Sequence, residues 1–216
     1  MRITATHNES LGHGHGRQVA WGPPVDHLIS VKVRATEGYS VEVSVLEVAV
    51  SITARLVDAI PLPMIYVRFR TSLQDAAIAG EVGKAFGKLG QFMATTQIRP
   101  IAPPLAVYSD WNKQLVTVDV GFPVAEFELG KVTGEIHAGR TPAGPAMKAI
   151  HHGSFDEIKE TYGVLQRAIE SKGEHVGGVM WEIYFNDPAT TPPKDLVTEV
   201  YMRLADAPAA TAAQRS

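Results

Sequence analysis

The chain has 216 residues, a net charge of −3 and a sequence pI near 6.2, and it contains no cysteine. These values exclude disulfides, thiolate metal ligands and a cysteine nucleophile, and they leave no broad positive field to attract nucleic acid. Apolar residues make up 45% and charged residues 20% of the sequence, which is typical of one folded domain of this length.

The two ends of the chain lack helical and strand periodicity. We expect a loosely ordered extension over residues 1–40 and a disordered Ala/Pro-rich tail over 206–216. His13 and His15 lie in the extension, and two histidines in a flexible arm give no closed metal shell. We therefore expect no metal and no cofactor. Charged residues interrupt the most apolar stretch, Val41–Val67, and we expect no signal peptide, because nothing at the start has a charged segment followed by an apolar one. We therefore expect no membrane contact and a cytoplasmic protein.

The first half of the domain shows a strand, a helix and two further strands. Met64–Arg70 is predicted as the first strand, after one or two leading strands of unclear register within 45–57. Two strands follow the helix, at Leu105–Ser109 and Leu115–Val120. The helix is predicted from apolar residues at helical spacing, namely Ile78, Val82, Phe86, Leu89 and Met93.

The second half repeats this order. A strand at Ala146–His151 precedes a helix over 155–172, and strands follow at Val179–Phe185 and Leu196–Leu204. The helix has Ser154 and Glu157 as a capping box at its start and Gly173 as a cap at its end. Its expected buried stripe contains Phe155, Ile158, Tyr162, Leu165 and Ile169.

Each unit has one helix to cover one face of its strands and cannot close a core alone. We therefore predict an α+β domain over 41–205, made of repeats at about 50–125 and 132–205. The duplicated strand-helix-strand-strand units should form one antiparallel sheet with pseudo-twofold symmetry and two helices on one face.

The strand at Val179–Phe185 is apolar on both faces except at Glu182, and a carboxylate there is costly unless it is paired, protonated or used by a ligand. Side chains alternate along a strand, so Met180, Glu182 and Tyr184 share one face. We expect Trp181, Ile183 and Phe185 to face the helices. The Glu182 set should then line the helix-free face and favour a flat cationic or a hydrogen-bonding ligand.

A purely structural role for Glu182 is the alternative. The carboxylate could pair with a basic side chain on a neighbouring strand, namely Lys148, Arg68 or Arg203, or it could reach solvent. The residue pattern alone does not separate this alternative from ligand binding.

Several short motifs resemble the GyrI-like effector-binding family in order and spacing. In the second half these are Pro142-Ala143-Gly144, His152-Gly153-Ser154-Phe155, Trp181-Glu182-Ile183-Tyr184, Asp187-Pro188 and Thr198-Glu199-Val200; in the first half they are Ala106-Val107-Tyr108-Ser109-Asp110 and Val120-Gly121-Phe122-Pro123-Val124. The resemblance covers about residues 50–205.

The resemblance implies a groove between the two repeats that binds small hydrophobic, often cationic or planar compounds. It places Glu182 at the floor of the groove with Tyr108 opposite, and we expect four further ligand-binding residues: Trp111, Met180, Tyr184 and His152. Stand-alone members of the family also suggest two alternatives. One is a hydrolase of cyclopropane-type electrophiles with Glu182 as base and Tyr108 as donor, and the other is a gyrase-interacting protein.

Four glycines mark the first helix, at Gly80, Gly83, Gly87 and Gly90. They do not form a phosphate loop, because Gly83-Lys84 is followed by Ala85 instead of Ser or Thr. They could allow close approach of the second helix or of a second copy of the chain, so we keep a homodimer as an open alternative.

Overall fold

The computed structural model describes residues 4–5, 29–34, 40–45 and 52–206, with side chains described only in the last range. The chain divides into two compact units, residues 1–51 and 52–216. In the first, β1 (Thr4–Ala5), β2 (Ile29–Arg34) and β3 (Ser40–Val45) form an antiparallel sheet in that order. Most of the expected extension, including His13 and His15, and nearly all of the expected tail lie outside the described residues.

The second unit is built on one eight-stranded antiparallel sheet, in the order β4-β9-β11-β10-β6-β7-β5-β8. The strands are β4 (Arg55–Ala59), β5 (Pro63–Ser72), β6 (Leu105–Ser109), β7 (Leu115–Pro123), β8 (His137–Arg140), β9 (Gly144–His152), β10 (Val176–Tyr184) and β11 (Val197–Leu204). The fold is therefore α+β with an antiparallel sheet, as the sequence predicts.

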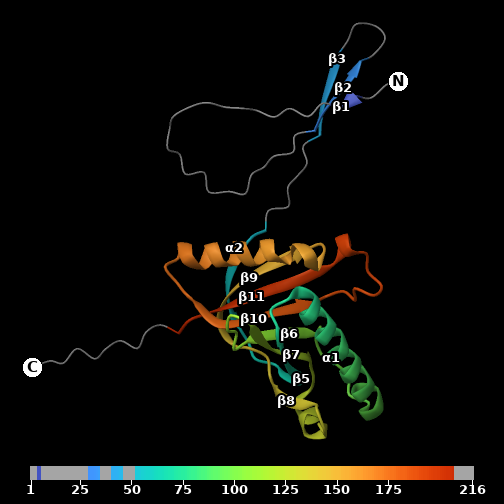
Figure 1. Ribbon diagram of the computed structural model, residues 1–216, viewed down its shortest axis with the longest axis vertical. Helices are drawn as coiled ribbons and strands as arrows, with labels where there is room; N and C mark the ends of the chain where they lie inside the picture. Colours follow the sequence, from blue (N-terminus) through green and yellow to red (C-terminus); the bar gives the residue numbers. More distant parts are fainter. Residues whose placement is uncertain (1–3, 6–28, 35–39, 46–51, 207–216) are drawn as a thin grey trace, which may run out of the picture. The chain divides into compact units, whose positions relative to one another are not determined.

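Two helices cover the sheet, one over each half (Figure 1). Helix α1 (Asp75–Thr96) packs on β5 and β7, and α2 (Ile158–Ser171) packs on β9 and β11. Three short 3-10 helices complete the unit: η1 (Glu126–Lys131), η2 (Phe155–Glu157) and η3 (Pro193–Asp195). No helix of the described residues has the length and apolarity needed to cross a membrane.

The ends of α2 show how the sequence sets its limits. The Ser154 side chain accepts a hydrogen bond from the Asp156 backbone N–H and so caps η2, the turn that leads into α2. Glu157 is the N-cap residue of α2 and makes no side-chain cap hydrogen bond, so the predicted capping box between Ser154 and Glu157 is not formed. At the other end Gly173 adopts φ +71°, and the N–H of Glu174 reaches the carbonyl of Ile169. This is a Schellman ending, which requires a left-handed residue and favours glycine.

The two halves use the same register. Arg55 of β4 lies opposite Lys148 of β9, and Tyr66 of β5 lies opposite His137 of β8. The second pair is therefore the first pair with the halves exchanged: Arg55 corresponds to His137 and Tyr66 to Lys148, each 82 residues further along the chain. The centre of the sheet is the pair β10 and β6, with the corresponding strands in mirrored order on either side. This arrangement is consistent with the predicted pseudo-twofold duplication.

The sheet is strongly curled. β4 and β5 are the first and seventh strands in the sheet, yet only Ile60, Pro61 and Leu62 connect them. Seven flat strands would span about 29 Å at a spacing of about 4.8 Å, whereas the connection reaches at most about 15 Å. The equivalent connection from β8 to β9 is also three residues long, and Thr141 in it exchanges two hydrogen bonds of 2.9 Å with Leu62.

Because of this curl, the helix-free face is concave and has its own apolar core. That core contains Met64, Leu105, Val107, Ala146 and Trp181. The helices cover the opposite face with two further clusters, one under α1 and one under α2. The sheet therefore lies between two apolar layers, which explains why β10 is apolar on both faces.

The four glycines of α1 face open space, and a Cβ added at any of them meets no atom within 4 Å among the described residues. They do not bring α1 against α2.

We expect Gly83→Ala to raise the free energy of unfolding by about 0.5–1 kcal/mol, because alanine loses less backbone entropy than glycine in a helix. Urea denaturation followed by circular dichroism measures this change. Gly121→Ala is the matched control and should destabilise the protein, since its Cβ would lie 2.6 Å from the Ile65 carbonyl oxygen. A destabilising Gly83→Ala would show that this face of α1 is covered.

Candidate functional site

Glu182 lies on β10 at the centre of the sheet, opposite Ala106 of β6. Its residue is only 6% exposed, and its side chain points toward the helices. Ala106 is small and fully buried. The residue opposite Glu182 on β6 is therefore not a second acidic group.

Three tyrosine hydroxyls surround this carboxylate. Tyr184 donates to Oε2 at 2.6 Å and Tyr108 donates to the same oxygen at 3.2 Å, while Tyr162 donates to Oε1. The hydroxyls of Tyr108 and Tyr184 are 3.4 Å apart. Both carboxylate oxygens are thus hydrogen-bonded, which is what a buried charge requires.

The three tyrosines come from three elements. Tyr184 lies on β10, the strand of Glu182 itself, and Tyr108 lies on the neighbouring strand β6. Tyr162 lies in α2 and descends from above the sheet. Its hydrogen bond to Glu182 therefore ties α2 to the middle of the sheet.

Burial changes the pKa values of Glu182 and of its three tyrosines. Loss of water raises the pKa of Glu182 from its ordinary value of 4.5, although hydrogen bonds from Tyr162, Tyr184 and Tyr108 and the nearby His151 act to lower it. Burial also raises the pKa of each of the three tyrosines well above 10, and the charge of Glu182 adds to this effect. The hydroxyls thus remain protonated donors across the neutral range.

Aromatic rings enclose the cluster on the helix side. Tyr184 packs edge-to-face against Phe86 of α1 and against Phe155 of η2, with ring centroids 6.1 and 5.7 Å apart. Phe86 in turn packs edge-to-face on Phe122 of β7. One acidic group therefore lies among rings contributed by both halves.

The face predicted for Glu182 is wrong. Met180, Glu182 and Tyr184 face the helices, while Trp181 and Ile183 belong to the core of the concave face. The prediction assigned the fully apolar set to the helices, but the curl of the sheet gives the opposite face an apolar core that takes Trp181, stacked on Tyr201. Of the roles that a buried carboxylate at this position could have, the structure shows a hydrogen-bonded one, because three tyrosines donate to it.

Glu182 forms no ion pair with Lys148, Arg68 or Arg203, the basic residues named in the structural alternative. Lys148 pairs with Glu199, Arg68 pairs with Asp119 at 2.6 Å, and Arg203 pairs with Asp206 at 3.2 Å. Glu182 is bonded by phenols alone among the described side chains.

The remaining predicted residues lie at varying distances from this centre. Met180 packs toward α2 beside Tyr108, and Trp111 packs at the edge of the α1 cluster. His152 is exposed and does not join the cluster. Its neighbour His151 is buried instead, with Nδ1 2.9 Å from Thr161 Oγ1 and Nε2 donating to the Ser154 carbonyl.

Sequence analysis missed Tyr162 as a site residue and assigned it only to the buried stripe of the helix. Its signal was available: a tyrosine in an apolar stripe needs a partner for its hydroxyl when it is buried. Glu182, the acidic residue of an otherwise apolar strand, was the natural partner.

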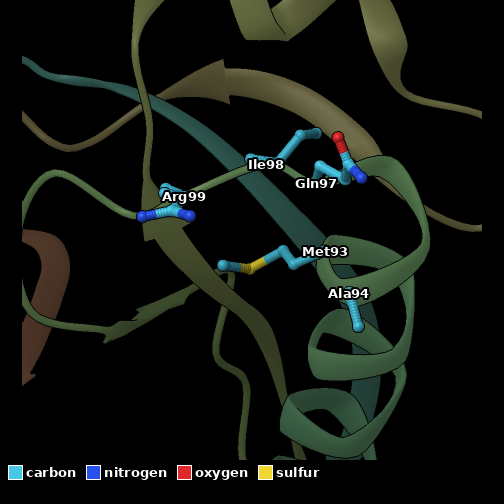
Figure 2. A pocket seen from close by; sticks show the side chains of 5 residues that line it. All are labelled: Met93, Ala94, Gln97, Ile98 and Arg99. Carbon is cyan, nitrogen blue, oxygen red and sulfur yellow. The ribbon is translucent and has the colours of Figure 1, made fainter.

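Two surface hollows lie away from Glu182. One, of about 430 Å³, is lined by Met93 and Ala94 at the end of α1 and by Gln97, Ile98 and Arg99 after it (Figure 2). The other, of about 390 Å³, lies between β5 and α1. Neither includes Glu182 or its tyrosines, and the acidic site itself is shielded from solvent, since Glu182 and Tyr108 are both buried. Among residues 52–206 no group of acidic and histidine side chains is arranged to hold a metal.

Comparison with known families gives one match. The model of the GyrI-like small molecule binding domain matches residues 53–205. A comparison with curated protein sequences finds no match.

Solved structures share the fold at low identity. The crystal structure of the EcmrR C-terminal domain has a TM-score of 0.62 and 18% identity, over 72% of this chain and 99% of that one. EcmrR in its complex with DNA has a TM-score of 0.62 and 20% identity, over 74% of this chain and 60% of that one. An uncharacterized conserved protein from Listeria innocua has a TM-score of 0.53 and 15% identity, over 70% of this chain and 92% of that one.

The raised pKa of Glu182 predicts a pH-dependent stability. A carboxyl group whose pKa is higher in the folded state stabilises the fold fully below its unfolded pKa, near 4.5, and this stabilisation is lost as the pH rises through the folded pKa. Glu182→Gln removes this dependence. We expect the variant to gain stability relative to the wild type as the pH is raised from 4 to 8.

Urea denaturation of both proteins at each pH measures the difference. Glu199→Gln is the matched control, since Glu199 also accepts a tyrosine hydroxyl but is paired with Lys148 on the other face. A difference between Glu182→Gln and wild type that does not change with pH would show that Glu182 keeps its ordinary pKa.

Proposed function

The chain belongs to the GyrI-like family of small-molecule-binding domains, and we propose that its ligands are small hydrophobic compounds, often cationic or planar, bound beside Glu182. The observation that carries this proposal is a buried carboxylate whose partners are three phenols, with no arginine or lysine bonded to it among residues 52–206. The hydroxyls stabilise its charge and leave that charge unbalanced.

The surroundings favour a cation that carries apolar groups. A positive charge near Glu182 gains a strong attraction because water is excluded there. The faces and edges of Phe86, Phe155 and Tyr184 offer apolar and cation–π contacts to the rest of such a ligand. A neutral compound would leave the carboxylate charge unbalanced and would gain only the apolar contacts.

Binding requires the site to open, since Glu182 is buried and tyrosine hydroxyls occupy both of its oxygens. Tyr162 is the contact to break, because it alone of the three tyrosines lies on a helix rather than on the sheet. The ligand then binds the opened arrangement of α2 better than the closed one, and its affinity is reduced by the free energy of opening.

We expect a lipophilic cationic dye such as rhodamine 6G to bind saturably, and Glu182→Gln to weaken it by about tenfold or more, which corresponds to about 1.4 kcal/mol. Fluorescence anisotropy measures both affinities. Glu199→Gln, on the opposite face, should bind the dye as the wild type does. Equal affinity of wild type and Glu182→Gln would contradict the proposal. Equally tight binding of a neutral dye such as Nile red would contradict the preference for a cation.

Hydrolysis of electrophilic cyclopropanes is a second candidate, favoured by the raised pKa of Glu182. A carboxylate with a pKa closer to neutrality is a better general base toward water, and the Tyr108 and Tyr184 hydroxyls can donate to a developing negative oxygen. Gyrase binding and a homodimer remain predictions that no observation favours.

For the hydrolase candidate, we expect incubation with a cyclopropane-bearing alkylating agent to yield its water adduct, detected by mass spectrometry. Glu182→Gln should abolish this turnover and Tyr108→Phe should reduce it. A rate for the wild type no higher than for Glu182→Gln would eliminate the candidate while leaving the binding proposal intact.

A further inference from the structure

Strand β5 extends beyond its neighbour at one edge of the sheet. β8 pairs only with Pro63–Tyr66, whereas β5 continues to Ser72. On its other side β5 is paired with β7 as far as Ser72. Among the described residues no strand pairs with the outer edge of residues 68–72.

The direction of the backbone groups on this edge follows from two hydrogen bonds. The Leu62 carbonyl accepts from Thr141 on the β8 side, and the Pro63 carbonyl accepts from Val124 on the β7 side. Backbone groups alternate between the two edges along a strand. The N–H and C=O groups of Arg68, Arg70 and Ser72 therefore point outward, where an added strand would meet them.

A hollow of about 390 Å³ adjoins this edge between β5 and α1. Val67, Phe69 and Ala85 contribute its apolar lining, and Lys84 and Lys88 of α1 also border it. Val67 and Phe69 belong to the α1 side of the sheet. Alternate side chains of an added strand would enter this hollow, and those between them would lie on the face of Arg68 and Arg70.

The charges around the edge favour an acidic partner. Lys84 pairs with Glu81, Lys88 pairs with Glu135, and Arg68 pairs with Asp119. Arg70 is exposed and forms no ion pair among the described residues, so it is the cation of this edge that is left unpaired. Two copies of this edge would bring their arginines together, which disfavours a second copy as the partner.

The geometry points to an extended peptide with alternating apolar and acidic residues, which adds a strand to β5 along Arg68–Ser72. Its backbone would bond with the outward groups of β5, its apolar side chains would fill the hollow, and its acidic side chains would face Arg70. Strand addition at an open edge beside a helix is a general mode of peptide binding. This surface is separate from the Glu182 site.

The test uses the full chain and a fluorescein-labelled Gly-Val-Glu-Val-Glu-Val peptide, with binding followed by fluorescence anisotropy. Arg70→Pro removes the outward N–H and leaves the ladder with β7, since proline is tolerated on an open edge. We expect it to bind the peptide at least about tenfold more weakly, a factor equal to 1.4 kcal/mol. Arg70→Ala, which keeps the N–H and loses the charge, should show a smaller loss.

Hydrogen exchange of the wild type provides a second measurement that does not depend on the variants. The amides of Arg70 and Ser72 should exchange quickly in the free chain and slowly with the peptide bound. The proposal is overturned by no saturable binding up to about 1 mM, by equal affinity for a peptide with Lys in place of Glu, or by protection that excludes residues 68–72.

Discussion

The arrangement of the domain centre depends on one constraint: the buried carboxylate of Glu182 must be hydrogen-bonded, and three tyrosine hydroxyls donate to it. The hydroxyls come from both central strands and from α2, so the position of the helix and the solvation of the carboxylate are set together. A buried carboxylate without such donors would be destabilising by several kcal/mol. The same donors keep the charge available to a cation that enters.

Local patterns in the sequence were sufficient for most of the elements. The bounds predicted for β6 agree with the structure, and those of the strands on either side of each helix agree to within three residues. Helix α2 was defined by its apolar stripe, by Ser154 at its start and by Gly173 at its end. These signals depend on neighbours in the chain, which is why they can be recognised without the fold.

The features that sequence analysis missed depend on distant contacts. The face of Glu182 follows from the curl of the sheet, and the curl follows from pairing β4 with β9 and β8 with β5, which no local pattern encodes. β8 itself, with Gly139 in a short segment, has no strand periodicity. Tyr108, Tyr184 and Glu182 were predicted to share a site, but whether they bind a ligand remains a prediction.

The exchange of edge strands between the halves has a consequence for how the chain folds. β4 belongs to the first half in sequence yet pairs with β9 of the second, and β8 belongs to the second half yet pairs with β5 of the first. On the ribosome, β4 must wait until more than eighty further residues have emerged before its partner exists. Neither half is complete alone, so folding should proceed as a single late, cooperative event rather than half by half.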